Sequence, residues 1–273
     1  MKNKPYKLLV VDIDGTLLGR DGAISAEDRG ALARVRRSEI QVALSTGRAA
    51  QACLVILEEL ALDGYHIFSD GALVGNPKTG EEVYAEPISP ELVRQMVDFV
   101  HREEIIFDLY TTGHFYIERE TWASDIRRKF FGLKPTIIDF TDLWRKERVI
   151  KGTLVVRSAE EKAKANMFYQ HFNDRLGLSW TKTPAYPDVD FINVISLGVS
   201  KGKALEALAG FLRIPLAEVM AIGDGANDAP VLSRAGLAVA MGNAPEELKV
   251  VANHITLDVE HNGVAAAVGK FLL

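Results

Sequence analysis

The stretch LLVVDIDGTLLG, residues 8–19, ends an apolar run in two aspartates. Its first four residues indicate a buried strand, and Asp12 and Asp14 follow at the carboxyl end of that strand. Side chains two residues apart on a strand point the same way, so the two carboxylates share a direction if the strand geometry persists. A like-charge pair there is stable only if a cation or a proton lowers the repulsion. We interpret the pair as a ligand site; the plainer alternative is an N-cap and a turn aspartate before Gly15.

Strand-like and helix-like segments alternate at both ends of the chain. Near the N-terminus we expect strands at 6–11, 40–45 and 65–68, helices from Ser25 and over 48–62, and a hairpin over 71–86. From residue 201 onward, helix and strand patterns alternate again. This alternation predicts right-handed βαβ crossovers and a mostly parallel sheet.

The middle of the chain has a different order. Strand patterns come in pairs and are followed by helices: strands at 105–110, 114–118, 150–157, 178–183 and 188–196, and helices from Ser89 and Ser158. Such an order is typical of a separate α+β unit. We therefore predict a doubly wound α/β core, residues 1–85 and 192–273, interrupted by an α+β cap over residues 86–191.

The composition is that of an ordinary globular protein, with 273 residues, one cysteine and a formal net charge of −5. An acidic chain argues against nucleic acid as the main partner, because nucleic-acid binding calls for a basic face. No apolar stretch approaches the ~20 residues of a membrane span. Asp12 interrupts the first apolar run too early for a signal peptide. We expect a cytoplasmic protein without a membrane partner, and we expect Cys53 to be a core residue.

A second apolar run, VMAIGDGANDAPVL at residues 219–232, also ends in carboxylates, Asp224 and Asp228. It nearly matches the dinucleotide-binding pattern G-x-G-x-x-G, but Asp228 stands where the last glycine is needed. Together with Asp12 and Asp14, these residues form an acidic cluster at two strand ends. Such a cluster suits a hard cation with oxygen ligands, Mg²⁺ above all.

Two further segments carry groups that bind anions. In ALSTGRAA, residues 43–50, Thr46 and Gly47 lie where a strand is expected to pass into a helix, whose N-terminus offers free N–H groups. A simple Ser/Thr N-cap is the alternative. Lys201 opens a helix in GVSKGKAL, where the helix dipole disfavours a cation. That position makes sense if the ammonium group faces carboxylates and phosphate.

Four motifs in this order, DIDGTLL (12–18), STGR (45–48), KGKAL (201–205) and GDGANDAPVL (223–232), resemble the signature motifs of the haloacid dehalogenase superfamily. The phrases SDGALV (69–74), AGLAVAMGNA (235–244) and HNGVAAAV (261–268) resemble its Cof-type sugar-phosphate phosphatases. The insertion between the second and third motifs has the same position as in that subfamily.

The resemblance implies a phosphatase that passes through an aspartyl-phosphate. Asp12 would be the nucleophile, and Asp14 would act first as general acid and then as general base. Asp12, the backbone carbonyl of Asp14, and Asp224 would hold Mg²⁺, with Asp228 supporting the site. The residues expected to bind the phosphoryl group are Thr46, Gly47, Lys201 and Asn227.

One residue departs from the family pattern. The subfamily usually has Asn-Gly-Ala where this chain has Asp70, Gly71 and Ala72. If this loop lines the substrate entrance, the added charge would alter the leaving-group preference, although a turn aspartate before glycine is the plainer explanation. Arg48 and Asn193 are further candidate substrate contacts.

We therefore expect Mg²⁺-dependent hydrolysis of a small phosphorylated metabolite, with sugar phosphates as the expected class. An enzymatic alternative is a phosphomutase, which uses the same phosphoaspartate but protects it from water. A non-catalytic alternative is a sensor of phosphorylated ligands built on a retired phosphatase core.

Overall fold

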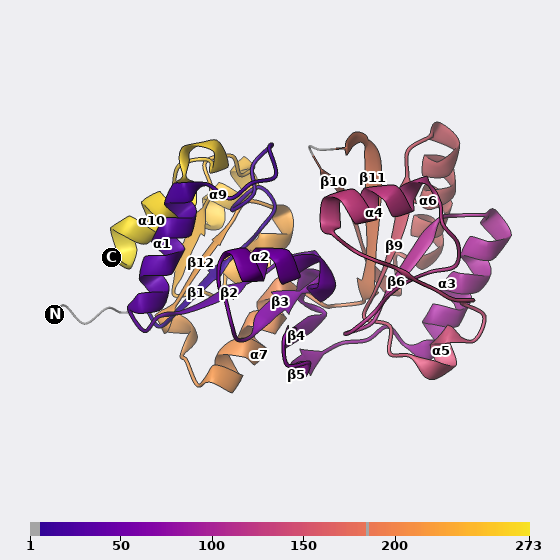
Figure 1. Cartoon of the computed structure of the whole chain (residues 1–273), viewed down its shortest axis with the longest axis horizontal. Coiled ribbons are helices and arrows are strands. Elements are labelled where there is room, and N and C mark those ends of the chain that lie inside the picture. Colours follow the sequence, from indigo (N-terminus) through magenta and orange to yellow (C-terminus); the bar gives the residue numbers. More distant parts are fainter. Residues whose placement is uncertain (1–5, 184–185) are drawn as a thin grey trace. The chain divides into compact units, whose positions relative to one another are not determined.

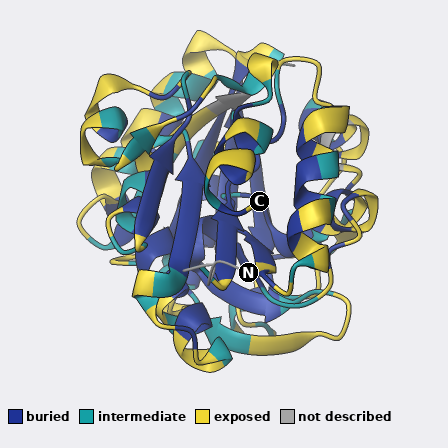
Figure 2. Ribbon diagram, turned by 90° about the vertical axis from the view of Figure 1, so that its left-hand side faces the viewer, coloured by how far each residue is buried: buried dark blue, intermediate teal, exposed yellow. Residues whose placement is uncertain are grey.

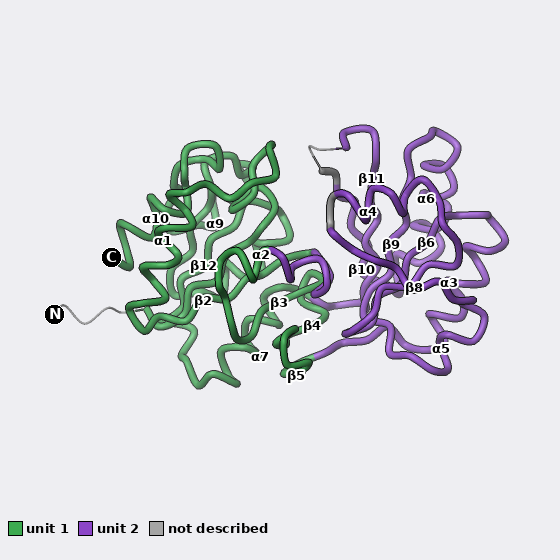
Figure 3. Tube along the Cα trace, in the orientation of Figure 1, with its two compact units in different colours: residues 1–47, 56–84, 200–273 green, residues 48–55, 85–199 purple. Residues whose placement is uncertain are grey.

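The computed structural model describes residues 6–183 and 186–273, and the chain divides into two compact units (Figures 1 and 3). The first unit holds the described residues up to 47, then 56–84 and 200–273; the second holds those of 48–55 and 85–199. The sequence placed residues 192–199 in the core. Strand β11 (Tyr186–Ser196) instead continues to Ser196 and pairs with strands of the second unit, to which residues 192–199 belong.

The first unit is built on a parallel five-stranded sheet in the order β14-β13-β12-β1-β2. Its strands are β1 (Leu8–Val11), β2 (Gln41–Leu44), β12 (Val219–Gly223), β13 (Leu237–Ala240) and β14 (His254–Ile255). All four residues of β1 are buried, and so are all five of β12 (Figure 2). Because successive strand residues point to opposite faces, both faces of these strands are covered, as a doubly wound α/β fold requires.

Helices supply that cover. They are α1 (Ala26–Arg37), α2 (Leu54–Glu59), α7 (Lys201–Leu212), α8 (Ala229–Leu232), α9 (Glu246–Val251) and α10 (Gly263–Phe271). Leu205 and Leu208 of α7 share a core cluster with Leu8 and Val10 of β1. One helix prediction is wrong in detail: 48–62 does not form one helix, because a 3₁₀ turn over Ala50–Cys53 precedes α2.

A three-stranded sheet follows β2 in the chain, in the order β3 (His66–Phe68), β4 (Leu73–Asn76) and β5 (Glu81–Ala85). A parallel bridge between Ser45 and Ile67 links the segment after β2 to β3. The predicted hairpin turn is confirmed, since Gly80 adopts a φ of 75° and donates its N–H to the carbonyl of Asn76. A 3₁₀ turn, η2 (Ser69–Gly71), joins β3 to β4.

The second unit is a six-stranded sheet in the order β10-β11-β9-β6-β7-β8. The remaining strands are β6 (Phe107–Tyr110), β7 (Phe115–Ile117), β8 (Thr136–Ile137), β9 (Lys151–Val156) and β10 (Leu176–Thr183). Its helices are α3 (Pro90–Glu103), α4 (Trp122–Phe131), α5 (Leu143–Lys146) and α6 (Ala159–Phe172). The predicted helix starts at Ser89 and Ser158 are confirmed: Ser89 is the N-cap of α3, and Ser158 forms a capping box with Glu161 at the start of α6.

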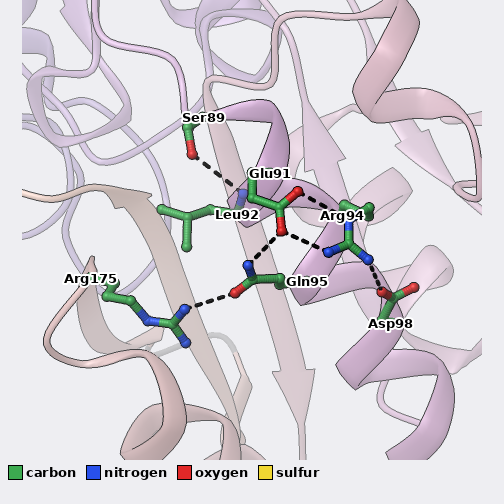
Figure 4. A network of polar contacts seen from close by, with 7 residues as sticks. All are labelled: Ser89, Glu91, Leu92, Arg94, Gln95, Asp98 and Arg175. Carbon is green, nitrogen blue, oxygen red and sulfur yellow. Dashed lines mark hydrogen bonds and ion pairs between the residues drawn. The ribbon is translucent and has the colours of Figure 1, made fainter.

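Polar contacts tie the start of α3 to the end of α6 (Figure 4). Gln95 accepts a hydrogen bond of 2.7 Å from Arg175, which follows α6, and donates one of 2.7 Å to Glu91. Arg94 pairs with Glu91 at 2.7 Å and with Asp98 at 3.0 Å. These side chains are largely exposed, so their ion pairs add little to the free energy of unfolding. We infer that they help to align α3 with the segment after α6. Among the described residues, no helix is long and apolar enough to cross a bilayer.

Candidate active site

The carboxyl ends of β1 and β12 bring acidic groups from distant parts of the chain together. Asp12 and Asp224 each follow the last residue of their strand, and the Asp12 N–H donates to the carbonyl of Ile222 at 3.0 Å. The parallel pairing of Val11 with Ile222 fixes their register. Carboxylate oxygens of Asp12, Asp224 and Asp228 all lie within 4.8 Å of one another. The structure thus places these three predicted site residues in one cluster.

Lys201 lies at the centre of this cluster. It is the first residue of α7 and is only 1% exposed. Its Nζ lies 2.6 Å from Oδ1 of Asp12 and 2.6 Å from Oδ1 of Asp228. Burial alone would lower the pKa of Lys201, but the charges of Asp12 and Asp228 raise it above its ordinary value, and Lys201 therefore stays an ammonium cation.

Asp228 supports this arrangement with both carboxylate oxygens. While Oδ1 pairs with Lys201, Oδ2 accepts the N–H groups of Asp224 at 3.0 Å and Gly225 at 2.9 Å. The side chain therefore locks the loop after β12 onto the start of α7. The supporting role expected of Asp228 stays a prediction, and these contacts are the ones through which it would act.

Asp224 has close neighbours that the sequence reasoning missed. Thr16 donates its hydroxyl to Oδ1 of Asp224 at 2.7 Å, and Asn243 donates its amide to the carbonyl of Gly15 at 2.9 Å. Gly15 adopts a φ of +88°, and a Cβ placed on it would lie 2.2 Å from Oδ2 of Asp224. Glycine is therefore required at this position. Thr16 lies in the motif DIDGTLL and Asn243 in AGLAVAMGNA. Their place in these motifs could have identified them as site residues.

The cluster carries more negative than positive charge. Burial, then the charges of Asp228 and Asp224, raise the pKa of Asp12 well above its ordinary value, although Lys201 opposes the shift. Burial and the charge of Asp228 also raise the pKa of Asp224, to about 6. Three carboxylates around one ammonium group leave two negative charges uncompensated. An all-oxygen donor set with this deficit fits a hard divalent cation such as Mg²⁺.

Asp14 lies outside the buried cluster. Strand geometry ends at Val11, so the premise on which Asp12 and Asp14 were expected to share a direction is wrong. Asp12 is 6% exposed, whereas Asp14 is exposed to solvent. The carbonyl of Ile13 accepts the N–H groups of the next turn and bends the chain away. Asp14 stays close enough for its charge to raise the pKa of Asp224.

The predicted phosphate-binding residues Thr46 and Gly47 follow β2. They do not open a helix, because the first helical turn begins at Ala50, and the Thr46 N–H already donates to the carbonyl of Ile67 at 3.0 Å. The expectation of a helix N-terminus here is therefore wrong. The exposed side chain of Asn227, in the turn η4 (Ala226–Asp228), donates to Oδ1 of Asp70 at 2.8 Å.

Arg48 and Asn193, the other candidate substrate contacts, belong to the second unit. Both are buried, at 9% and 7% exposure. Asn193 lies in β11, and its amide donates to the hydroxyl of Thr181 in the neighbouring strand at 3.3 Å. Sequence reasoning did not anticipate that these two side chains are buried.

Comparison with known proteins extends these observations. The sequence model of haloacid dehalogenase-like hydrolases matches residues 9–268. The chain is 30% identical to phosphatase YwpJ of Bacillus subtilis over 280 residues, covering 95% of this chain and 97% of the relative. It is 27% identical to the 5-amino-6-(5-phospho-D-ribitylamino)uracil phosphatase YcsE of the same organism, covering 98% of this chain and 96% of the relative.

Solved structures agree. The subclass IIB sugar phosphatase BT4131 superposes with a TM-score of 0.78 at 26% identity, covering 97% of this chain and 98% of the other. A haloacid dehalogenase-like hydrolase from Bacteroides thetaiotaomicron gives a TM-score of 0.84 at 25% identity, covering 97% and 99%. The chain belongs to the haloacid dehalogenase superfamily, in its Cof-type branch, and it is a phosphatase.

Proposed function

We propose that the chain hydrolyses small phosphomonoesters, sugar phosphates and related phosphorylated polyols, with Mg²⁺ and through a phosphoaspartate on Asp12. The observation that carries this proposal is the buried chain of ion pairs from Asp12 through Lys201 to Asp228, with Asp224 beside it. The substrate class is supported by the names of two relatives, a ribitylaminouracil phosphate phosphatase and a sugar phosphatase.

In the proposed reaction, an oxygen of Asp12 attacks phosphorus while the bond from phosphorus to the leaving-group oxygen breaks. Lys201 binds Oδ1 of Asp12, so we assign the attack to Oδ2. Asp14 gives its proton to the leaving oxygen, and its exposure suits a group that exchanges protons. Water then attacks the phosphoaspartate, Asp14 accepts the proton of that water, and inorganic phosphate and the free Asp12 carboxylate result.

The proposed metal ligands are Asp12, Asp224 and the backbone carbonyl of Asp14. When bound, Mg²⁺ would screen the repulsion between carboxylate and phosphate and polarise the phosphoryl oxygens. Lys201 and Asn227, together with the loop at Thr46 and Gly47, are the groups we assign to the equatorial phosphoryl oxygens.

The test is release of inorganic phosphate from p-nitrophenyl phosphate and from a set of hexose and pentose phosphates, with Mg²⁺ or with EDTA. We expect EDTA to abolish turnover and Asp12→Asn to lower kcat/KM by about 10³-fold or more, because the amide is not a nucleophile. Asp63→Asn removes an exposed carboxylate of the same unit and serves as the matched control.

Three results would contradict the proposal. Retained turnover in Asp12→Asn would refute the nucleophile assignment. Accumulation of an isomeric sugar phosphate without free phosphate would identify a phosphomutase. Binding without turnover across the whole set would identify a sensor.

A further inference from the structure

Asp70 is a buried carboxylate in contact with the residues that we assign to the phosphoryl group. It is 8% exposed and lies in the turn between β3 and β4. Ser69 and Asp70 both adopt left-handed backbone conformations, with φ of 52° and 55°. Side-chain-bearing residues seldom adopt this region unless their surroundings enforce it. The turn is therefore held in place rather than chosen by local preference.

Two contacts hold it. A Cβ on Gly71, whose φ is +100°, would lie 2.3 Å from the carbonyl oxygen of Ser200, so the turn packs directly against the start of α7. On the other side, the Asp70 N–H donates to the carbonyl of Thr46 at 3.1 Å. The turn thus joins the 46–47 loop to the helix that begins with Lys201, and these contacts fix the backbone from which the Asp70 carboxylate projects.

That carboxylate contacts two of the assigned phosphate ligands. Its Oδ1 accepts the side-chain amide of Asn227 at 2.8 Å. A Cβ on Gly47 would lie 3.0 Å from Oδ1 and 3.2 Å from Oδ2, so the carboxylate lies directly against this glycine. Its negative charge also acts on Lys201, whose pKa is lowered by burial and raised by Asp12, Asp228 and Asp70.

A carboxylate is an unfavourable choice here on two counts. Its Oδ2 is buried and has no hydrogen-bond partner among the residues that the structure describes, which leaves a polar atom unsatisfied. Its charge also lies beside groups that would bind a phosphate dianion, which it must repel. Asparagine has the same shape and would keep an acceptor for Asn227 without the charge.

We propose that Asp70 sets how tightly the active site holds phosphate: its carboxylate orients the Asn227 amide toward the phosphoryl group, and its charge weakens retention of inorganic phosphate so that the product leaves. The inference rests on the proposed function, since it assumes that phosphate binds beside Asn227 and Gly47. One charge acting over several ångström in a partly screened site changes anion affinity by about tenfold.

The test compares Asp70→Asn, Asp70→Ala and the control Asp63→Asn, which removes an exposed carboxylate before β3 rather than after it. The affinity for inorganic phosphate is measured calorimetrically with Mg²⁺, alongside kcat and KM. We expect Asp70→Asn to bind phosphate about tenfold more tightly and to show stronger product inhibition. Asp63→Asn should match the wild type.

Asp70→Ala removes both the charge and the acceptor for Asn227. We expect its kcat/KM to fall below that of Asp70→Asn, and the side-chain amide signal of Asn227 in an NMR spectrum to shift further in Asp70→Ala, which has no acceptor, than in Asp70→Asn. Unchanged phosphate affinity in both variants would overturn the charge role. Equal kcat/KM and equal amide signals in the two would overturn the positioning role. A wild-type protein that binds phosphate but hydrolyses nothing would refute the proposed function while leaving the affinity comparison valid.

Discussion

The metal-free core should lose stability as the pH rises from about 4 to about 6, because Asp224 holds its proton more tightly in the folded state. Burial, followed by the charge of Asp228, raises the pKa of Asp224 from 3.8 to about 6, while the hydrogen bond from Thr16 opposes the shift. A raised folded-state pKa means that the folded protein binds more protons than the unfolded chain across this window. The stabilisation from protonated Asp224 is fully present below the pKa of the unfolded chain, and it is lost as the pH rises through the pKa of the folded protein.

The magnitude follows from the shift. A difference of about two pKa units corresponds to about 3 kcal/mol, which is a large fraction of the stability of a domain. Mg²⁺ should oppose this effect, since a bound cation favours the ionised carboxylates. At saturating Mg²⁺ the loss between pH 4 and pH 6 should disappear.

Native-state hydrogen exchange at the amides of β1 and β12, in EDTA and at several pH values, measures the opening of the core directly. Tryptophan fluorescence would not serve, because Trp122, Trp144 and Trp180 all belong to the second unit. Asp224→Asn provides the difference measurement, since it keeps the shape and removes the titration. If the wild type and Asp224→Asn show the same pH dependence in EDTA, the charge argument for this cluster is wrong.

Three substitutions test a close backbone approach and the effect of burial on an ion pair. Gly15→Ala would drive a methyl group into Asp224 and should lower Mg²⁺ affinity by about 10- to 100-fold in a titration monitored by turnover; wild-type affinity would contradict this. In the second unit, Arg127→Met breaks a buried 2.6 Å ion pair with Asp108 and should cost about 3–5 kcal/mol in urea unfolding followed by tryptophan fluorescence. The adjacent, exposed Arg128 pairs with Glu120 and Asp125, and Arg128→Met should cost less than about 1 kcal/mol; equal costs would refute the burial argument.

The α/β class was predictable because a buried parallel strand appears in the sequence as a short continuous run of apolar residues. Continuous apolar runs such as residues 8–11 and 219–223 need cover on both faces, and the helices between them supply it. The acidic cluster was predictable for the same reason, since parallel strands end at one edge of the sheet. Caps such as Ser158 with Glu161 were legible because a capping box is a contact within four residues.

The predictions that failed concern features set by contacts between residues far apart in the sequence. Residues 50–53 form a 3₁₀ turn, and Ala49 and Ala52 pack with Tyr110 and Phe115 rather than following one helical stripe. No local pattern could show this. Asp14 diverges from Asp12 because strand geometry ends at Val11 and the chain turns over the carbonyl of Ile13. Burial of Asp70 was equally invisible, since it results from packing against the start of α7, about 130 residues away.

Lys201 explains how a cluster with excess negative charge can exist before a metal ion binds. A cation at the start of a helix is unfavourable in itself, and the two ion pairs with Asp12 and Asp228 more than offset that cost. These pairs keep Asp12 oriented, whereas Asp224 accepts its side-chain hydrogen bonds from a hydroxyl and an amide and forms no ion pair with Lys201. The uncompensated negative charge of the cluster both destabilises the metal-free fold and attracts Mg²⁺. A second positive side chain placed beside Asp224 would therefore stabilise the metal-free protein and weaken its affinity for Mg²⁺.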